Sequence, residues 1–298
     1  MRKNKPKTKA DLQKLLEKEN INLANIDTSL ITDMSRLFIN SNRSDFSGVN
    51  KWNTSNVTNM SEMFKSCKNF NLRLTFDTKN VEDMSNMFNG CENFNQELDF
   101  DTQNVLNMTG MFINCKNFNK PLSFNTTKVI NMSNMFGGCE NFNQELNFDT
   151  QNVIEMDYMF SNCKNFNKPL SFNTTKVINM SNMFNGCESF NQKLDFDTQN
   201  VEDMSYMFNK CKKYNQPLYF NTQNVTCMNY MFGECESFNQ MLKFDTKNIT
   251  NIMTIFYGCY SLEQTFQFDL RSCKNKALIL NANPNMKIID ISQSSING

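Results

Sequence analysis

Apolar and polar positions recur along this chain at one strict interval, the step from Val57 to Val81 to Val105. Four apolar columns define the repeat, and each holds one residue type almost throughout: valine, methionine, phenylalanine and cysteine. The first members of the nine-membered columns are Val57, Met60, Phe64 and Cys67. A variant copy with two extra residues precedes them, with Ile31, Met34 and Phe38. Self-similarity this regular predicts a solenoid.

The repeat has two halves with different hydrophobic periods. Counted from Val81, the apolar offsets are 0, 3, 6, 7 and 10, which fall within an arc of about 120° and predict a short helix. Asn80 and Asp83 resemble a capping pair for that helix. In the other half, Leu98 and Phe100 flank one polar residue, which predicts a very short strand. Prolines that donate no ladder hydrogen bond stand just before the strand in three copies, at Pro121, Pro169 and Pro217.

These patterns predict an α/β repeat solenoid with one short parallel strand and one short helix per coil, in about ten coils. A single coil is not stable alone, because ordering its residues at about 1.5 kcal/mol each roughly cancels its burial gains. We expect a capping helix in residues 1–25, around Leu12, Leu15 and Leu16, and the ten coils over residues 26–268. Residues 269–298, with "ALIL" and "MKIIDIS", are expected to form an irregular C-terminal cap.

The residue after each column cysteine alternates in charge from coil to coil: Lys68, Glu92, Lys116, Glu140, Lys164, Glu188, Lys212 and Glu236. Alternation gives each lysine glutamate neighbours in a stack, whereas identical charges would repel. Each exposed pair contributes only about 0.2–1 kcal/mol, but a slip by one coil would place like charges together. Residues 115–136 and 163–184 are identical, so duplication of a two-coil block is a second cause, and we favour both together.

Composition excludes several classes of function. The chain has 30 basic and 30 acidic residues, so no global field favours nucleic acid or anionic lipid. It has no histidine, which removes the usual general base and the commonest zinc ligand. No apolar run approaches the length of about 18 residues that a membrane-spanning helix requires, so no span is expected. The segment "MRKNKPKTKADLQKLLEKEN" has no apolar region typical of an export signal.

The cysteine column is the strongest candidate for chemistry. The chain has neither a C-x-x-C motif nor histidine, which does not favour a metal site. Stacked copies would have parallel Cβ vectors, a poor geometry for disulfides. We therefore expect these cysteines to be small buried residues. Cys227 and Cys273 lie outside the column and are the better candidates for reactive thiols.

The other columns are interpreted as structural. Methionine and phenylalanine at this spacing favour core packing over a ligand tunnel. A threonine column is also found in ice-binding solenoids, but here each threonine follows Asp or Asn in a turn or capping position: Thr78, Thr102, Thr126, Thr150, Thr174, Thr198, Thr222 and Thr246. The acidic residues do not match the calcium-binding nonapeptide pattern. We expect no catalytic residue, metal or cofactor.

One row of variable residues is a candidate binding face. Between the inward Leu and Phe of each predicted strand, one residue faces outward: Thr75, Asp99, Ser123, Asn147, Ser171, Asp195, Tyr219, Lys243 and Gln267. Solenoids commonly bind partners along such a row, and the alternative is a face that only keeps the protein soluble. Tyr219 beside Lys243 is the most distinctive pair, because tyrosine is enriched in binding hot spots.

The segments "NVTNMSEMFKSCKNFN", "FDTKNVEDMSNMF" and "IDTSLITDMSRLF" resemble BspA-like bacterial surface proteins and the related Mycoplasma-type lipoprotein repeat, over about residues 26–270. The resemblance implies a leucine-rich-repeat-like solenoid and a cell-surface role in adhesion to host proteins or other bacteria, without catalytic residues.

Two functional hypotheses follow. The first is a non-enzymatic, adhesin-like scaffold that binds a host, matrix or bacterial protein along the strand face. The alternative is an intracellular repeat scaffold, such as an immunity or effector factor, with a cytoplasmic location. The patterns predict neither the partner nor the oligomeric state.

Overall fold

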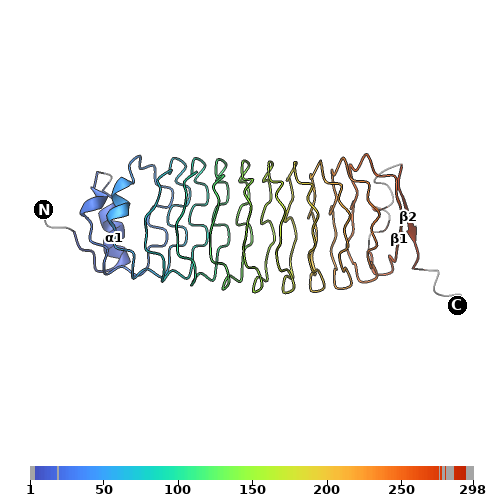
Figure 1. Cartoon of the computed structure of the whole chain (residues 1–298), viewed down its shortest axis with the longest axis horizontal. Coiled ribbons are helices and arrows are strands. Elements are labelled where there is room, and N and C mark those ends of the chain that lie inside the picture. Colours follow the sequence, from blue (N-terminus) through green and yellow to red (C-terminus); the bar gives the residue numbers. More distant parts are fainter. Residues whose placement is uncertain (1–3, 19, 275, 277–278, 280–284, 293–298) are drawn as a thin grey trace. The chain divides into compact units, whose positions relative to one another are not determined.

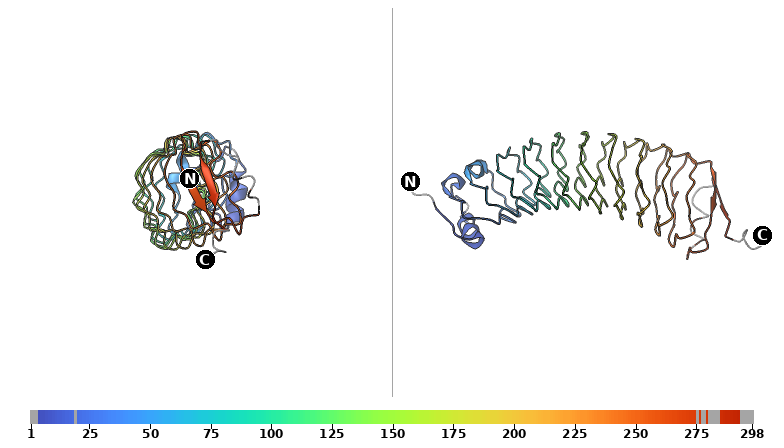
Figure 2. Two further views of the ribbon diagram at one scale, coloured as in Figure 1. Left: turned by 90° about the vertical axis from the view of Figure 1, so that its right-hand side faces the viewer. Right: turned by 60° about the horizontal axis from the view of Figure 1, so that its bottom comes forward.

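The computed structural model describes residues 4–18, 20–274, 276, 279 and 285–292 of the chain. The chain divides into two compact units, Met1–Asn152 and Val153–Gly298. Figures 1 and 2 show that successive coils make up each unit, and that almost none of this chain is drawn as helix or strand. Parallel bridges join Asp83 to Asn107 and Asn107 to Asn131, which confirms a repeated architecture with the interval of the sequence columns.

The regular elements lie near the two ends of the sequence. The first unit contains helix α1 (Lys9–Leu16) and two 3-10 helices, η1 (Leu23–Asn25) and η2 (Ser47–Lys51). The second unit contains strands β1 (Thr265–Phe268) and β2 (Lys287–Asp290), which pair in parallel in a two-stranded sheet, as labelled in Figure 1.

Helix α1 begins at a capping box. The side chain of Thr8 accepts a hydrogen bond from the Asp11 amide at 3.1 Å, and the Asp11 carboxylate accepts one from the Thr8 amide at 3.0 Å. Leu12 is fully buried, while Leu15 and Leu16 are half-buried. The boundaries expected for the two caps and the coils between them stay predictions, and part of "ALIL" lies outside the described residues.

The prediction of a helix in each coil is wrong. Residues 81–91, where the apolar pattern is helical, form successive tight turns instead. Every second amide donates to the carbonyl three residues earlier: Met87 to Met84 at 3.2 Å, Asn89 to Asn86 at 3.1 Å, and Cys91 to Phe88 at 2.9 Å. A spacing of three residues places apolar side chains on one side of such turns, as it would on a helix.

Left-handed backbone explains why no helix forms there. Asn86 and Gly90 have φ values of 55° and 77°, and a right-handed helix does not admit such residues. Asn and Gly adopt this conformation at the lowest cost. The prediction that Asn80 and Asp83 form a capping pair is wrong too. The Asp83 carboxylate accepts a hydrogen bond from the Ser85 amide at 2.8 Å, and the Asn80 amide group donates one to the Ser55 carbonyl at 2.8 Å.

Amides that do not close a turn join one coil to the next. In the first unit, four alternate amides donate to the following coil: Met84 to Asn107 at 3.1 Å, Asn86 to Thr109 at 2.8 Å, Phe88 to Met111 at 2.9 Å, and Gly90 to Ile113 at 2.7 Å. The second unit repeats the pattern, with Asn182 donating to Ser205 at 2.8 Å and Phe184 to Met207 at 2.9 Å. The backbone is therefore satisfied by turns within a coil and a ladder between coils.

The prediction of a parallel strand at the Leu98 and Phe100 positions is wrong for most coils. Both side chains are buried and Asp99 is exposed, as alternation predicts. In the described residues, however, the only strand at this repeat position is β1, which β2 pairs. Phe124 and Phe148, at the Phe100 position, have ring centroids 6.5 Å apart, whereas Phe88 and Phe112, on the hydrogen-bonded side, have ring centroids 5.7 Å apart. We attribute the absence of ladder hydrogen bonds on this side to that wider spacing.

The core of each unit is built from the apolar columns. The valine, methionine and phenylalanine side chains of the first half of the repeat are almost fully buried. Their phenyl rings stack from coil to coil, with centroids 5.7 Å apart for Phe88 and Phe112 and also for Phe184 and Phe208. Stacked aromatic rings add to the stability gained from burial alone. The columns are therefore core, as predicted.

Replacing Met108, which is fully buried, with aspartate should destabilise the first unit. An unpaired buried charge costs about 3–5 kcal/mol, so we expect a clearly lower melting temperature by scanning calorimetry. Leu106→Asp is the matched control, because Leu106 is 43% exposed and surface substitutions usually change stability by less than about 0.5 kcal/mol. Equal melting of the two variants would contradict the packing described above.

Tyr214→Phe should stabilise the second unit. Tyr214 stands in a phenylalanine column, is fully buried, and its hydroxyl has no hydrogen-bond partner. An unsatisfied buried polar group costs about 1–3 kcal/mol, so the phenylalanine variant should unfold at a higher denaturant concentration. Tyr219→Phe, at a side chain that is 79% exposed, should leave the midpoint unchanged. A lower midpoint for Tyr214→Phe would show that the hydroxyl is stabilising.

Candidate functional site

The outward row is exposed at all nine predicted positions. Each of these residues lies between two buried side chains, as Thr75 does between Leu74 and Phe76. The first unit carries Thr75, Asp99, Ser123 and Asn147, and the second carries Ser171, Asp195, Tyr219, Lys243 and Gln267. Whether this row binds a partner stays a prediction.

In the first unit, the row is polar and partly cross-linked. Arg73 forms ion pairs with Asp99 at 2.6 Å and with Glu97 at 3.7 Å. The hydrogen bond and the charge of Asp99 raise the pKa of Arg73. Asn50 accepts from the Thr75 amide at 3.1 Å and donates to the Arg73 carbonyl at 2.9 Å. Side chains thus join neighbouring coils where strand pairing is absent.

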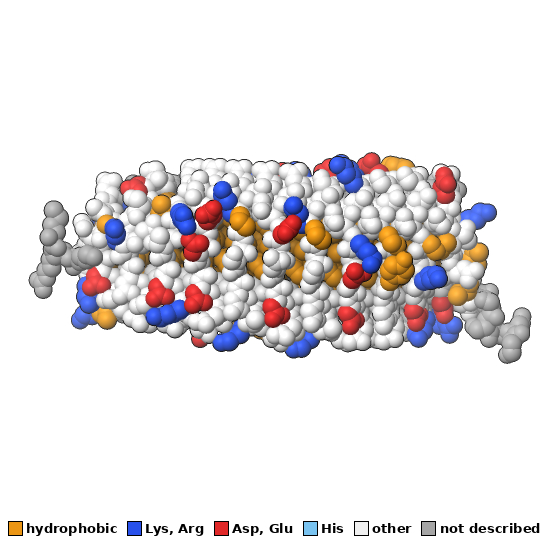
Figure 3. All heavy atoms as spheres, in the orientation of Figure 1, with side chains coloured by type: hydrophobic (Ala, Val, Ile, Leu, Met, Phe, Trp, Pro, Cys, Tyr) orange, Lys and Arg blue, Asp and Glu red, His pale blue; other side chains and the backbone are white. Residues whose placement is uncertain are grey.

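In the second unit, the row carries its largest side chains. Tyr219 is 79% exposed, and Met241, two residues before Lys243, is also exposed. Lys193 forms an ion pair with Asp195 at 2.8 Å, and this contact raises the pKa of Lys193. Figure 3 shows apolar side chains reaching the surface between groups of both charges on the face in view. Tyr219 and Lys243 of the row, with Met241 beside them, expose both apolar and charged groups to a partner.

The alternating charges form the expected ladder. In the first unit, Glu92 is paired with Lys116 at 2.8 Å and with Lys68 at 3.2 Å. Hydrogen bonds from Lys116 and then Lys68 lower the pKa of Glu92. In the second unit, Lys212 and Glu188 are 2.9 Å apart. These are surface pairs, and salt should weaken them.

The column cysteines donate hydrogen bonds from one coil to another. The Cys91 thiol donates to the Phe64 carbonyl at 3.1 Å, and the Cys187 thiol to the Phe160 carbonyl at 3.0 Å. All eleven cysteines of the chain are free, and those of the column are buried, as predicted. Burial raises the pKa of Cys67 to about 11 and that of Cys259 to about 12. A thiol with so high a pKa is a poor nucleophile, because thiolate is the reactive form.

The two cysteines outside the column differ in exposure. Cys227 is half-buried, whereas Cys273 is buried and donates to the Ile249 carbonyl at 3.1 Å. Burial is the main cause that raises the pKa of each thiol. The prediction of a more reactive thiol therefore keeps a structural basis at Cys227 and loses it at Cys273.

The threonine column is internal. The Thr78 hydroxyl donates to the Asp101 carbonyl of the next coil at 2.9 Å, and the Thr78 side chain is almost fully buried. The same contact recurs in the second unit, where Thr198 donates to the Asn221 carbonyl at 2.9 Å. These hydroxyls link coils, and the buried column does not form the exposed array that ice binding requires.

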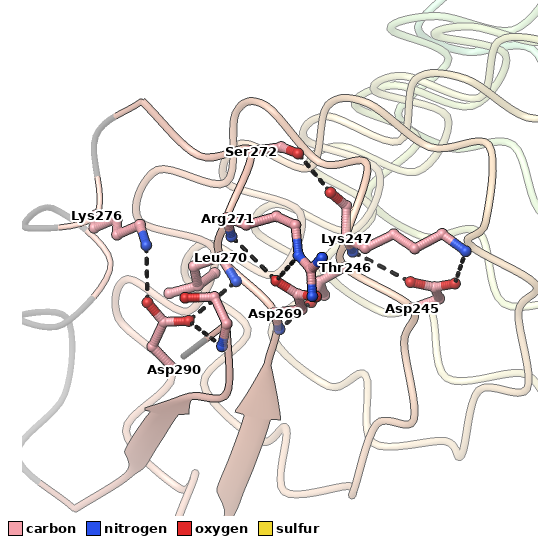
Figure 4. Close-up of polar contacts among 10 residues, drawn as sticks. Asp245, Thr246, Lys247, Asp269, Leu270, Arg271, Ser272, Lys276 and Asp290 are labelled. Atoms are coloured by element: carbon pink, nitrogen blue, oxygen red, sulfur yellow. Dashed lines mark hydrogen bonds and ion pairs between the residues drawn. The ribbon is translucent and has the colours of Figure 1, made fainter. Parts of the chain in front are cut away.

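A polar cluster at the end of the second unit holds β2 against the preceding coil (Figure 4). Asp290 accepts from the Leu270 amide at 3.2 Å and is paired with Lys276 at 2.9 Å. Burial alone would raise the pKa of Asp290, but hydrogen bonds from Lys276, Ser292 and Leu270 lower it overall. The sequence predicted an irregular cap around "MKIIDIS" and indicated neither strand β2 nor this anchor, because no repeat column contains Asp290.

Within the described ranges, no group of three or more histidine, cysteine or acidic side chains could hold a metal ion. In the same part of the chain, no helix has the length and apolar character needed to cross a bilayer.

Thiol labelling should separate Cys227 from the column cysteines. With a disulfide reagent at pH 8, we expect native protein to react quickly at Cys227 only, because the other thiols are buried. Unfolded protein should react at all eleven cysteines. Cys227→Ser should remove the fast phase and leave the melting temperature nearly unchanged. Fast labelling of several cysteines in that variant would contradict the buried column.

The comparisons with known proteins give a family. Residues 10–123, 122–195 and 194–290 each match the family model described as "Mycoplasma protein of unknown function, DUF285". No curated protein and no solved structure matched significantly. The predicted similarity to a Mycoplasma repeat is thus confirmed at this level, while BspA-like identity stays a prediction. Because the three matches cover nearly all of the sequence, the chain belongs to the Mycoplasma protein family DUF285.

Proposed function

We propose that this chain is a non-enzymatic, adhesin-like scaffold of the bacterial surface that binds a protein partner along the outward row. The observation that carries the proposal is the exposure of all nine residues of the row, each between two buried neighbours. A buried neighbour on each side fixes the backbone from which each outward side chain projects. A surface ordered in this way loses less conformational entropy on binding than a flexible one.

The backbone ladder supports an extended binding surface. Alternate amides join each coil to the next in both units, so one row residue follows another at a regular interval. We propose that the coils form a leucine-rich-repeat-like solenoid without the helix that such repeats commonly contain. Repeat proteins of this kind use extended surfaces to contact partners.

The chemistry of the buried columns supports a binding role over catalysis. The thiols, which are the most nucleophilic groups of the repeat, are buried with raised pKa values. The outward row consists of hydroxyl, amide, carboxylate, phenol and ammonium groups, at most one from each coil. Such a row provides contacts spread over a partner, whereas catalysis needs several groups around one reacting atom.

Combining Tyr219→Ala with Lys243→Ala should weaken partner binding by about tenfold or more, as expected when a tyrosine hot spot is removed. Binding would be measured to immobilised extracellular matrix and to intact bacterial cells. Melting should not change, because both residues are exposed. Lys79→Ala with Lys128→Ala is the control, at exposed positions outside the row. Unchanged binding by the Tyr219 and Lys243 variant would remove this part of the row from the proposal.

Protease treatment of intact native cells tests the location, with a cytosolic protein as control. Selective loss of the chain would support a surface adhesin. Protection until lysis would contradict the adhesin and favour the alternative, an intracellular scaffold with immunity or effector function.

A further inference from the structure

The outward row continues onto strand β2. The parallel register of the two strands places Ile289 beside Gln267 and Lys287 beside Thr265. Paired residues of neighbouring parallel strands have their side chains on the same face of the sheet, and all four of these residues are exposed. In the second unit the row therefore has a further member, Ile289, which no repeat column contains.

Large apolar side chains reach the surface at this end of the row. Tyr219 is 79% exposed, Met241 49% and Ile289 48%. Single exposed apolar residues are normal on a protein surface. These three share one face, because Met241 lies two residues before Lys243 and Ile289 pairs with Gln267 of the row. Apolar groups collected on one face indicate a site of contact with another protein.

The charges at this end leave two lysines without a partner. Residues 240–292 contain six basic and four acidic residues. Three of the four carboxylates form ion pairs with a neighbouring cation (Figure 4): Asp245 with Lys247 at 3.3 Å, Asp269 with Arg271 at 2.7 Å, and Asp290 with Lys276 at 2.9 Å. The fourth, Glu263, lies outside the row. In the described part of the chain, the exposed side chains of Lys243 and Lys287 take part in no ion pair.

The step between coils matches an extended chain. Phe172 and Phe196, each buried next to a row residue of this unit, have ring planes 4° from parallel and centroids 6.5 Å apart. Because the two rings are equivalent in the repeat, this distance is close to the step from one coil to the next beside the row. Alternate residues of an extended chain are about 6.6 Å apart, so every second side chain of a bound segment would meet one coil.

We propose that this end of the row binds an extended acidic segment of a protein partner, in which apolar residues flank alternate aspartates or glutamates. The apolar residues contact Tyr219 and Met241 at one end and Ile289 at the other. The carboxylates between them pair with Lys243 and Lys287, and this opposite charge excludes basic segments. A nucleic acid fits less well, because two lysines neutralise few phosphates. The inference rests on the proposed function, since it names the partner chemistry of the same row.

Defined peptides test this chemistry with the whole chain. The probe is a fluorescein-labelled heptapeptide with leucine, glutamate, glutamate and leucine at alternate positions and serine between them, followed by fluorescence anisotropy at low salt. We expect it to bind at least about tenfold more tightly than the same peptide with lysine in place of glutamate, because like charges repel across an interface. No binding of the glutamate peptide, equal affinity for the two peptides, or tighter binding of a single-stranded oligonucleotide would overturn the proposal.

Reversing both lysines gives the decisive variant. Lys243→Glu combined with Lys287→Glu should lose at least about tenfold in affinity for the glutamate peptide and should gain affinity for the lysine peptide, because the charges are then opposite again. Melting should not change, since both side chains are exposed. Lys213→Glu with Lys274→Glu is the matched control, at exposed lysines of the same unit outside the row. Equal binding of the glutamate peptide by the two double variants would contradict the site.

A further variant tests the part of the site on β2. Ile289→Ser should lower the affinity for the glutamate peptide about threefold or more, because it removes the apolar contact of one leucine. Ile178→Ser is its control, since Ile178 is 38% exposed in the same unit but outside the row. Full binding by Ile289→Ser would overturn the extension of the site onto β2.

Failure of this inference is distinguishable from failure of the proposed function. Suppose that peptide binding ignores both lysines, while Tyr219→Ala with Lys243→Ala still weakens binding to matrix and cells. The inference is then overturned and the proposed function stands. If the peptides instead bind as expected, but that variant binds matrix and cells normally, the acidic-segment site is supported and this part of the row leaves the adhesin proposal.

Discussion

The division of backbone amides between two kinds of hydrogen bond determines the architecture of both units. Every second amide of the first half of the repeat closes a turn within its coil, and the amides between them donate to the next coil. Left-handed residues at two positions per coil, such as Asn86 and Gly90, make this division geometrically possible. The apolar columns, the thiol hydrogen bonds and the stacked rings all follow from coils held in one register.

The sequence predicted the repeat and its core correctly because the columns depend only on which side chains point inward. Val81, Met84 and Phe88 are buried in a turn structure as they would be in a helix, so hydrophobic periodicity could not separate the two. Asn and Gly recurring four residues apart were a signal against a helix. The expected strands failed for another reason: alternation at Leu98 and Phe100 predicts an extended chain, whereas a strand also needs a neighbour close enough to pair with.

The sequence predicted the candidate binding surface but not the contacts outside the repeat. Exposure of Tyr219 and Lys243 followed from alternation alone, and the structure places both on the surface. The anchor at Asp290 lies outside the repeat and so had no column to reveal it.

The alternating lysine and glutamate column has a consequence for how a chain of this kind can change in length during evolution. Removing one coil would bring two residues of equal sign together, whereas removing or adding two coils would keep every neighbour opposite. The identity of residues 115–136 and 163–184 records a copy of that two-coil size. Insertions and deletions in related genes should therefore be tolerated most readily in steps of two coils. Two coils are the interval at which the charge pattern repeats, whereas the fold alone repeats at every coil.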